Sequence, residues 1–249
     1  MQFSKNWLKE FIDIDLSTQE ICHQLTMAGL EVDGYEDVKS KITGNDSIIK
    51  LDITPNRGDC FSVLGVAREL AVINNLKFSL PKINKISESF TDDINLKVCK
   101  DGPIYFGRTI KNISLKSKTL PLIAERLKLS DQKLIDPVVD ITNYILLELG
   151  QPLHAFDRQK LNGDITVRLA KEKEKIILLD DQELELDSSC LVISDEKEAV
   201  AFAGIMGGKA SSVTDKTNSI FLESAFFKPS IIRGKARKFG FQTDASIRF

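Results

Sequence analysis

Apolar residues recur at helical spacing along the first seventy-five residues of the chain. Residues 4–12 place their apolar side chains on one stripe behind a serine that can cap the helix. Residues 17–20, Ser-Thr-Gln-Glu, form a capping-box pattern that opens a second helix, which ends at Gly29. Turn-forming residues 54–59 lead into a third apolar stripe over residues 62–73. The pattern predicts a small helical N-terminal domain.

Extended segments are short in this first part. Residues 30–32 form a brief apolar stretch, and residues 49–53 alternate between apolar and polar positions, which indicates a strand. Residues 77–93 then mix Lys, Ser, Asn and Asp around isolated apolar side chains, a composition typical of a linker. We therefore expect an N-terminal domain over residues 1–85 and a second domain over residues 86–249.

The second part of the chain mixes helical and strand patterns without regular alternation. Helices are expected over residues 119–129, 140–150 and 229–238. Alternating or continuous apolar runs predict strands over residues 94–98, 104–113, 164–169, 175–179, 183–186, 190–194, 198–203 and 219–224. Because strands and helices do not alternate regularly, the fold class is expected to be α+β, with a mixed α/β domain following the helical one.

Composition narrows the class of protein. The chain carries 34 basic and 36 acidic side chains, an ordinary balance for a globular protein. No apolar run reaches the ~18–20 residues that a membrane-spanning helix needs, which excludes an integral membrane protein. The four cysteines are too far apart for a zinc site or a disulfide framework, so we expect reduced thiols in a cytoplasmic protein.

Charge is unevenly distributed. Residues 1–60 carry six basic and eleven acidic side chains, whereas residues 228–249 carry six basic side chains and one acidic one. Basic residues in the second segment include Arg233, Lys235, Arg237 and Lys238. Such a cluster suggests a polyanionic partner. The alternative interpretation is that these basic residues only form the solvent-exposed face of a helix.

Two side chains carry the chemistry that the chain offers for a site. His154 follows a helix end within Gly-Gln-Pro-Leu-His-Ala-Phe-Asp, where a loop imidazole can donate, accept or exchange a proton. His23 lies within a helix with no ligand set around it, and we interpret it as structural. Glu223 is the only charge in the apolar run over residues 219–227; if that strand is covered on both faces, the carboxylate is buried and needs a partner.

A glycine-rich turn over residues 204–208 lacks the lysine and spacing of a P-loop, so it is weak support for nucleotide binding. Glycines there also allow a ligand to approach the backbone closely. The sequence contains no metal-ligand cluster and no dinucleotide fingerprint. An enzymatic function therefore depends on whether His154, Gly207, Glu223 and Thr243 converge.

Taken together, these motifs resemble those of one family, the β subunit of bacterial phenylalanyl-tRNA synthetase. The similarity begins with Phe-Ser-Lys-Asn-Trp-Leu over residues 3–8 and continues to Thr-Asp-Ala-Ser over residues 243–246. Between them, the matching segments are residues 25–34, 54–60, 139–144, 150–157, 204–208 and 222–227, in the order of the family. The chain is identified on these motifs as the N-terminal part of such a subunit.

The resemblance implies an editing module in the second domain, which hydrolyses tyrosine wrongly attached to the tRNA for phenylalanine. By this resemblance Glu223 would recognise the para-hydroxyl of tyrosine, and His154 would act at the ester together with the pocket residues Thr142 and Asn143. Small or short side chains would shape the pocket wall and floor, at Gly207, Thr243 and Ala245.

The resemblance also implies partners and cofactors. The synthetic site, with ATP and magnesium, would lie in an α subunit, in a heterotetramer of two α and two β subunits that binds the tRNA for phenylalanine. No metal or cofactor is expected in this segment. Fewer than twenty residues separate Gly34 from Leu51, too few for the oligonucleotide-binding barrel of the family, which is therefore expected to be absent. The length suggests a fragment of a longer subunit.

Two alternatives stay open. A freestanding hydrolase acting in trans would share the pocket without the obligate partner. A non-catalytic tRNA-binding or assembly module would keep a vestigial pocket.

Overall fold

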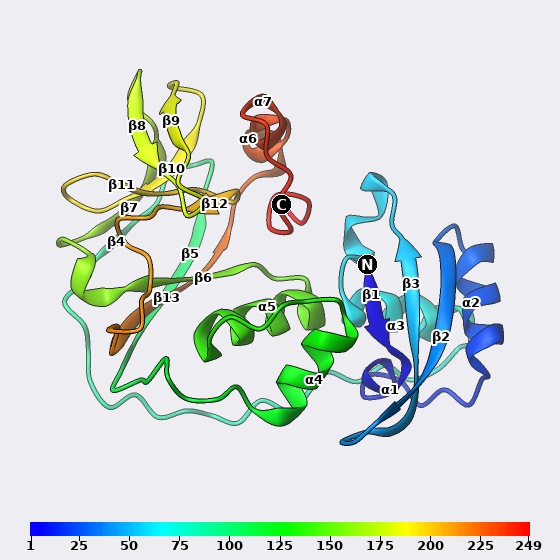
Figure 1. The fold of residues 1–249 in the computed structure, drawn as a ribbon. Helices are drawn as coiled ribbons and strands as arrows, with labels where there is room; N and C mark the ends of the chain where they lie inside the picture. The colour runs from blue at the N-terminus through cyan, green and yellow to red at the C-terminus, as the bar shows by residue number, and fades with distance from the viewer. The chain divides into compact units, whose positions relative to one another are not determined.

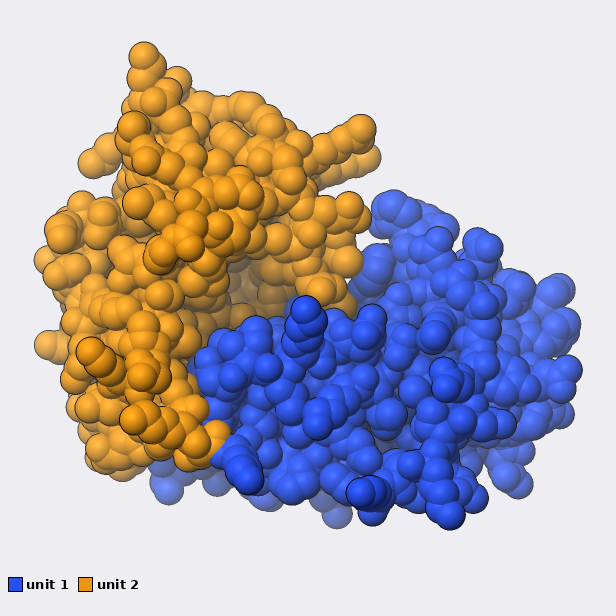
Figure 2. Space-filling view, in the orientation of Figure 1, with its two compact units in different colours: residues 1–87, 118–151 blue, residues 88–117, 152–249 orange.

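The computed structural model describes residues 1–249 and divides them into two compact units, coloured separately in Figure 2. The first unit holds residues 1–87 and 118–151, and the second holds residues 88–117 and 152–249. Both combine helices with mostly antiparallel sheets, which confirms the predicted α+β class. None of the helices has both the length and the apolar content needed to cross a membrane.

The first unit contains a three-stranded antiparallel sheet in the order β1-β3-β2 together with five α-helices (Figure 1). Its elements are β1 (Gln2–Ser4), α1 (Lys5–Leu8), α2 (Thr18–Met27), β2 (Glu31–Ser40), β3 (Gly44–Asp52), the 3-10 helix η1 (Pro55–Cys60), α3 (Val63–Ile73), α4 (Pro121–Leu129) and α5 (Pro137–Leu149). The expectation of a helical domain is corrected here. Strand β2 has no buried residue, so its sequence lacks the apolar alternation that reveals a strand.

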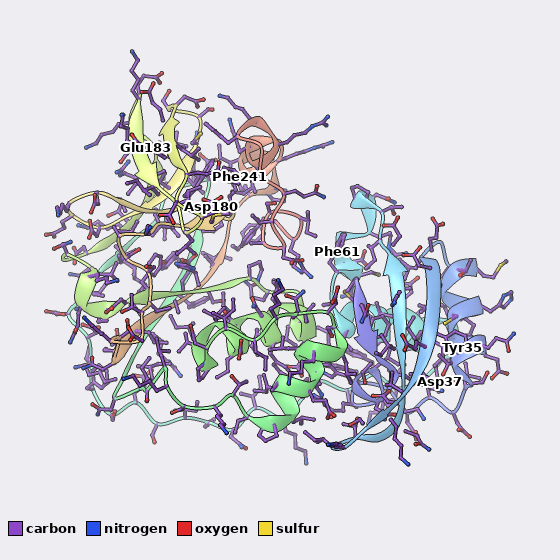
Figure 3. The ribbon with its side chains drawn as sticks, viewed as in Figure 1. Tyr35, Asp37, Phe61, Asp180, Glu183 and Phe241 are labelled. Carbon is purple, nitrogen blue, oxygen red and sulfur yellow. The ribbon has the colours of Figure 1, made fainter.

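A long hairpin occupies the stretch that is too short for the family's barrel. Strands β2 and β3 pair from Glu31 opposite Asp52 to Ser40 opposite Gly44, with one irregularity between Val32 and Gly34. Tyr35 and Asp37 both lie on β2 (Figure 3). The hydroxyl of Ser47, on β3, donates to the Asp37 carboxylate over 2.6 Å, a side-chain link across the hairpin.

Helix starts in this unit follow the capping residues of the sequence. Ser17 and Glu20 form the predicted capping box, and the Ser62 hydroxyl accepts from the Gly65 amide at the start of α3. Helix α5 begins at Pro137, earlier than predicted, because Asp136 accepts from two free amides of the first turn. It ends where Gly150 adopts the left-handed conformation, as predicted.

Helices α4 and α5 belong to the first unit because they complete its buried polar network. The Trp7 ring stacks on Tyr144 with centroids 4.9 Å apart, and its indole nitrogen donates to Glu148 over 3.2 Å. The Tyr144 hydroxyl donates to the same Glu148 oxygen over 2.7 Å and accepts from Arg126 over 2.8 Å. Arg126, 4% exposed, also pairs with Glu10. The sequence showed that these helices have apolar faces, but an apolar face does not specify which core it covers.

The second unit contains a five-stranded sheet in the order β12-β11-β10-β7-β4, a three-stranded sheet in the order β5-β13-β6, and the hairpin β8-β9. Asp180 and Glu183 mark the turn and the second strand of that hairpin in Figure 3. The elements are β4 (Leu96–Lys97), β5 (Ile104–Lys111), β6 (Leu153–Asp157), the 3-10 helix η2 (Arg158–Lys160), β7 (Ile165–Leu169), β8 (Glu174–Ile177), β9 (Glu183–Leu186), β10 (Leu191–Ser194), β11 (Ala199–Phe202), β12 (Met206–Gly207), β13 (Ser219–Phe226), α6 (Pro229–Ile232) and α7 (Lys235–Lys238).

Most predicted strands of this unit are present with bounds close to those expected, and β9 matches exactly the range 183–186. The helix predicted over residues 229–238 is instead two short helices. Gly234 adopts a left-handed conformation with φ of 76°, which breaks the helical path between α6 and α7.

The connection between α3 and β4 contains no helix or strand, in agreement with the linker predicted there. Its end is fixed to the second unit, because Arg158 donates to both carboxylate oxygens of Asp92 over 2.8 Å. The chain therefore first crosses between units after Ser87, close to the boundary predicted near residue 85. The chain then returns to the first unit for residues 118–151. The prediction of one boundary between two continuous domains is therefore wrong for this segment.

Candidate functional site

The three-stranded sheet of the second unit places two predicted site residues opposite each other. At Glu223, in the central strand β13, His154 is the partner from β6 and Gly107 is the partner from β5. Directly opposed residues of an antiparallel pair project from the same face, so the Glu223 and His154 side chains are neighbours. Tyr105 lies two residues before Gly107 and therefore on this face too.

The Glu223 carboxyl group is buried. The residue is 6% exposed, and its Oε2 atom has no hydrogen-bond partner in the chain. Burial raises the pKa of Glu223 to about 8, and the neighbouring Tyr105 hydroxyl acts in the opposite direction. The group is therefore mostly a neutral acid at pH 7, able to donate as well as accept a hydrogen bond.

Tyr105 is a polar neighbour of Glu223 that the sequence analysis missed. Its hydroxyl is buried and has no hydrogen-bond partner. Burial first, and the Glu223 carboxylate second, hold the pKa of this phenol well above its ordinary value. Alternation along β5 does show that Tyr105 and Gly107 share a face of the strand. It does not show that this face adjoins Glu223, because the partner strand β13 lies more than a hundred residues away in the sequence.

His154 is held as a neutral imidazole. Burial lowers its pKa to about 4, and its Nε2 atom is buried without a partner. The ring stands nearly perpendicular to Phe156, with centroids 4.4 Å apart. Such a group can accept a proton or orient a hydroxyl through an uncharged nitrogen.

Gly207 gives the imidazole its space. A Cβ atom at Gly207 would lie 2.3 Å from Cε1 and 2.6 Å from Nε2 of His154, closer than real Cβ contacts. Strand β12 brings this glycine into the sheet, where it pairs with Ala201. The glycine-rich turn therefore serves the close approach of a side chain of the chain itself.

The last residues of the chain are fixed to the same turn. The Thr243 hydroxyl donates to the Ile205 carbonyl over 2.9 Å, two residues before Gly207. Thr243 also accepts from the amide of Ser246, in a short turn that includes Ala245. Thr243 is thus anchored to the glycine-rich turn, and Ala245 follows it closely.

Two predicted pocket residues lie in the other unit. Thr142 and Asn143 are on α5, where the Thr142 hydroxyl donates to the Val139 carbonyl of its own helix over 2.8 Å. The second unit therefore brings together His154, Gly207 and Glu223, with Thr243 attached to the turn beside them.

Four basic residues predicted to bind tRNA lie in the segment from α6 to α7: Arg233, Lys235, Arg237 and Lys238. Two of them are engaged within the unit, because Lys235 donates to the Ser189 hydroxyl over 2.5 Å and Lys238 pairs with Asp187. Arg233 and Arg237 are exposed and have no partner within the chain, so their guanidinium groups are available to an anion.

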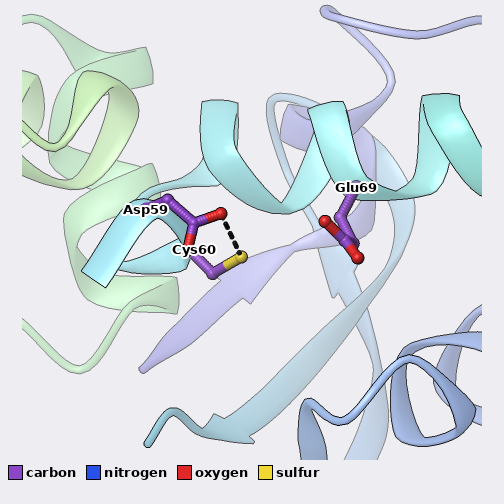
Figure 4. A group of neighbouring side chains, drawn as sticks. All are labelled: Asp59, Cys60 and Glu69. Atoms are coloured by element: carbon purple, nitrogen blue, oxygen red, sulfur yellow. Dashed lines mark hydrogen bonds between the residues drawn. The ribbon is translucent and has the colours of Figure 1, made fainter. Parts of the chain in front are cut away.

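A group of potential metal ligands occurs in the first unit, where Asp59, Cys60 and Glu69 converge (Figure 4). The guanidinium of Arg57 donates to all three side chains, over 2.9 to 3.2 Å. Burial and Asp59 raise the pKa of the Cys60 thiol to about 11, which disfavours the thiolate that a metal would bind. The charge of this group is therefore compensated by Arg57, and the arrangement is structural.

Comparison with known proteins agrees with the motif resemblance. Residues 101–249 match the family described as B3/4 domain. The chain is 50% identical over 216 residues to "Phenylalanine--tRNA ligase beta subunit" of Idiomarina loihiensis, covering 86% of this chain and 27% of that protein. The protein of the same name from Photorhabdus laumondii gives the same figures, and that of Acinetobacter baylyi is 48% identical over 214 residues, with the same coverage of each chain.

The chain spans about a quarter of the length of these curated relatives. Among solved structures, an N-terminal fragment of the phenylalanyl-tRNA synthetase β subunit from Pyrococcus horikoshii aligns with a TM-score of 0.44 at 18% identity. That alignment covers 93% of this chain and 70% of the other. The resemblance inferred from the motifs is confirmed by the relatives.

Proposed function

This chain belongs to the B3/4 domain family, and we propose that its second unit is an editing site, which hydrolyses tyrosine wrongly joined to the tRNA for phenylalanine. The observation that carries the proposal is the buried carboxyl of Glu223, unpartnered at Oε2 and placed beside the neutral imidazole of His154. The curated relatives are named as phenylalanine–tRNA ligase beta subunits, and this name supplies the substrate class, an aminoacylated tRNA for phenylalanine.

A second site of this kind answers a physical difficulty. A pocket built for phenylalanine cannot strongly reject tyrosine, because adding one hydroxyl changes discrimination by only about 10² in comparable cases. In an editing pocket the preference is reversed. The tyrosine hydroxyl gives the Glu223 carboxyl a partner, whereas phenylalanine leaves that buried group unpaired, at a cost of about 1–3 kcal/mol.

His154 acts at the ester in this proposal. Its neutral nitrogen can accept a hydrogen bond from an attacking water or from a ribose hydroxyl of the terminal adenosine. Water then adds to the carbonyl carbon, and the bond to the ribose oxygen breaks, with the proton passing to that oxygen. Gly207 leaves room for the imidazole, and Thr243 fixes the turn that carries Gly207.

The remaining assignments follow from the same family. Arg233 and Arg237 would contact tRNA phosphates, while Lys235 and Lys238 would first have to leave Ser189 and Asp187. Ala245, in the second unit, is proposed as a further pocket residue. The partner is an α subunit in a heterotetramer of two α and two β subunits; that α subunit would hold the synthetic site, where ATP and magnesium act.

The test compares two substrates. Tyrosyl-tRNA and phenylalanyl-tRNA are incubated with the protein assembled with its α subunit, and we expect tyrosyl-tRNA to be deacylated at least tenfold faster. Glu223→Ala should remove that preference. Gly207→Ala should slow hydrolysis by displacing His154, whereas Gly58→Ala, where a Cβ meets nothing within 4 Å, should not.

Each alternative gives a different result. Equal, background-level decay of both substrates would contradict editing and leave the non-catalytic tRNA-binding or assembly module. Full activity without the α subunit would indicate the freestanding hydrolase acting in trans.

A further inference from the structure

Tyr105 lies beside Glu223 on the same face of the sheet, and the proposed function gives it no role. Both residues are buried, at 8% and 6% exposure. The Tyr105 hydroxyl and the Glu223 Oε2 atom each lack a hydrogen-bond partner. The two residues nevertheless project from the same face of the β5–β13 pair, on diagonally neighbouring positions of the register. Two adjacent buried groups that can partner each other are costly when they stay apart.

The chain offers Glu223 no other polar support. Burial disfavours the ionised carboxylate, and the Tyr105 hydroxyl is the one side chain that favours it. His154 is paired with Glu223 on the neighbouring strand β6. The lowered pKa of His154 is nevertheless caused by burial alone and not by the Glu223 carboxyl. The hydroxyl of Tyr105 is therefore the group within the protein that can hold the carboxyl in one orientation.

The surroundings of Tyr105 favour a fixed hydroxyl. Its ring belongs to the apolar core of the second unit, and its cross-strand partner is the small residue Ala225. Next to it, the Phe221 ring lies over Gly107, where a Cβ atom would come 2.1 Å from Cζ. A phenol packed in this way loses little further conformational entropy when it donates a hydrogen bond.

We propose that Tyr105 is a positioning residue of the editing site. Its hydroxyl donates to one carboxyl oxygen of Glu223 and leaves the other carboxyl oxygen for the hydroxyl of the bound tyrosine. Hydrogen bonds of this kind commonly tighten when a substrate binds. The inference rests on the proposed function for its substrate and on the geometry of the pair for its mechanism.

Tyr105→Phe in the α-subunit assembly tests the role in catalysis. It keeps the ring and removes the hydroxyl, so we expect the ratio of tyrosyl-tRNA to phenylalanyl-tRNA deacylation to fall about tenfold, the effect of one hydrogen bond. The pH dependence of that ratio should shift to higher pH, because the ionised form of Glu223 loses its donor. Tyr144→Phe removes the hydroxyl of a partly buried tyrosine beside a glutamate in the first unit, and it should leave both ratio and profile unchanged.

A double variant separates positioning from packing. If Tyr105 acts through Glu223, then Tyr105→Phe added to Glu223→Gln should change the ratio no further. An additional loss in the double variant, or an unchanged ratio and pH profile in Tyr105→Phe, would overturn the inference.

A direct titration keeps the inference testable if the protein proves not to edit. Carbon-detected NMR of the Glu223 carboxyl should show a higher pKa in Tyr105→Phe than in the unmodified protein. An unchanged pKa would overturn the positioning role, whereas a protein without preference for tyrosyl-tRNA but with the shifted pKa would contradict the proposed function alone.

Discussion

Each unit places a tyrosine beside a buried glutamate, and the two pairs differ in how their polar atoms are satisfied. In the first unit the Tyr144 hydroxyl donates to Glu148 and accepts from Arg126, and Trp7 donates to the same carboxylate. In the second unit the Tyr105 hydroxyl and the Glu223 Oε2 atom have no partners.

The difference separates a network whose polar atoms are paired within the protein from a pair that leaves two buried polar atoms without partners. A network whose buried groups are all paired stabilises the packing of helices and requires no ligand. A buried group left unpaired costs free energy, and such costs are found where a protein uses the group for function. The same residue types therefore have opposite meanings in the two units, and stability measurements can distinguish them.

The largest effect is expected from Glu223→Gln at high pH. Because the native pKa of Glu223 is about 8 and its ordinary value is 4.5, the native state binds the proton more tightly, and stability falls as pH rises through this range. At pH 9 the variant should be more stable than the unmodified protein by as much as about 4 kcal/mol. Denaturant unfolding followed by hydrogen exchange in β13 measures this, and a difference that does not vary with pH would contradict the burial of a titrating carboxyl.

The next largest effect is a loss of stability, which is expected in the first unit from Arg126→Met. The substitution removes the bonds to Tyr144 and Glu10 and the contact of the guanidinium with the Trp7 ring, 5.1 Å from its centroid. We expect the first unit to lose about 3 kcal/mol. Trp7 is the only tryptophan, so its fluorescence reports this unit. Unchanged fluorescence midpoints would show that the network contributes little, and β13 exchange serves as the control.

His154 should give a smaller effect at acidic pH. Its pKa is lowered to about 4 from 6.5, so the unfolded state takes up the proton first, and stability is lost as pH falls through this window. The loss by pH 4 should be about 2 kcal/mol, reduced from the full linkage value because the residue as a whole is of intermediate exposure. His154→Gln should not show it; an equal acid loss in the variant would assign the effect to other groups.

The smallest effect tests the two tyrosines directly. Tyr144→Phe removes a satisfied hydroxyl and should cost the first unit about 1 kcal/mol, whereas Tyr105→Phe removes an unpartnered one and should change the stability of the second unit by less than about 0.5 kcal/mol at pH 7. Thermal and denaturant unfolding of both variants provide the comparison. Equal losses would mean that the Tyr105 hydroxyl is paired in solution.

Local signals predicted many of the elements. Ser17 and Glu20 gave the start of α2, and the alternation of residues 183–186 gave β9, because caps and alternation act within a few residues. Strand β2 was missed beyond its first residues, since its side chains are exposed or half-exposed and its stability comes from pairing with β3. The break at Gly234 was missed because a glycine can also remain within a helix.

The site was predicted only in part for a related reason. Glu223 stood out as one charge in an apolar run, but that pattern left open whether the carboxyl is buried, as the structure shows it to be. Its pairing with His154, and the presence of Tyr105 on the same face, depend on the register of three strands that are distant in sequence. No local pattern specifies that register.

The chain passes three times from one unit to the other, and this affects the order in which the units can fold during synthesis. The first unit cannot close its core until residue 151 has emerged from the ribosome, because α4 and α5 supply part of that core. Strand β5 emerges before that point but has its partner in β13, more than a hundred residues later. A nascent chain thus holds β5 as an unpaired, partly apolar strand while the first unit completes its core, and such a strand is prone to aggregate unless it is protected.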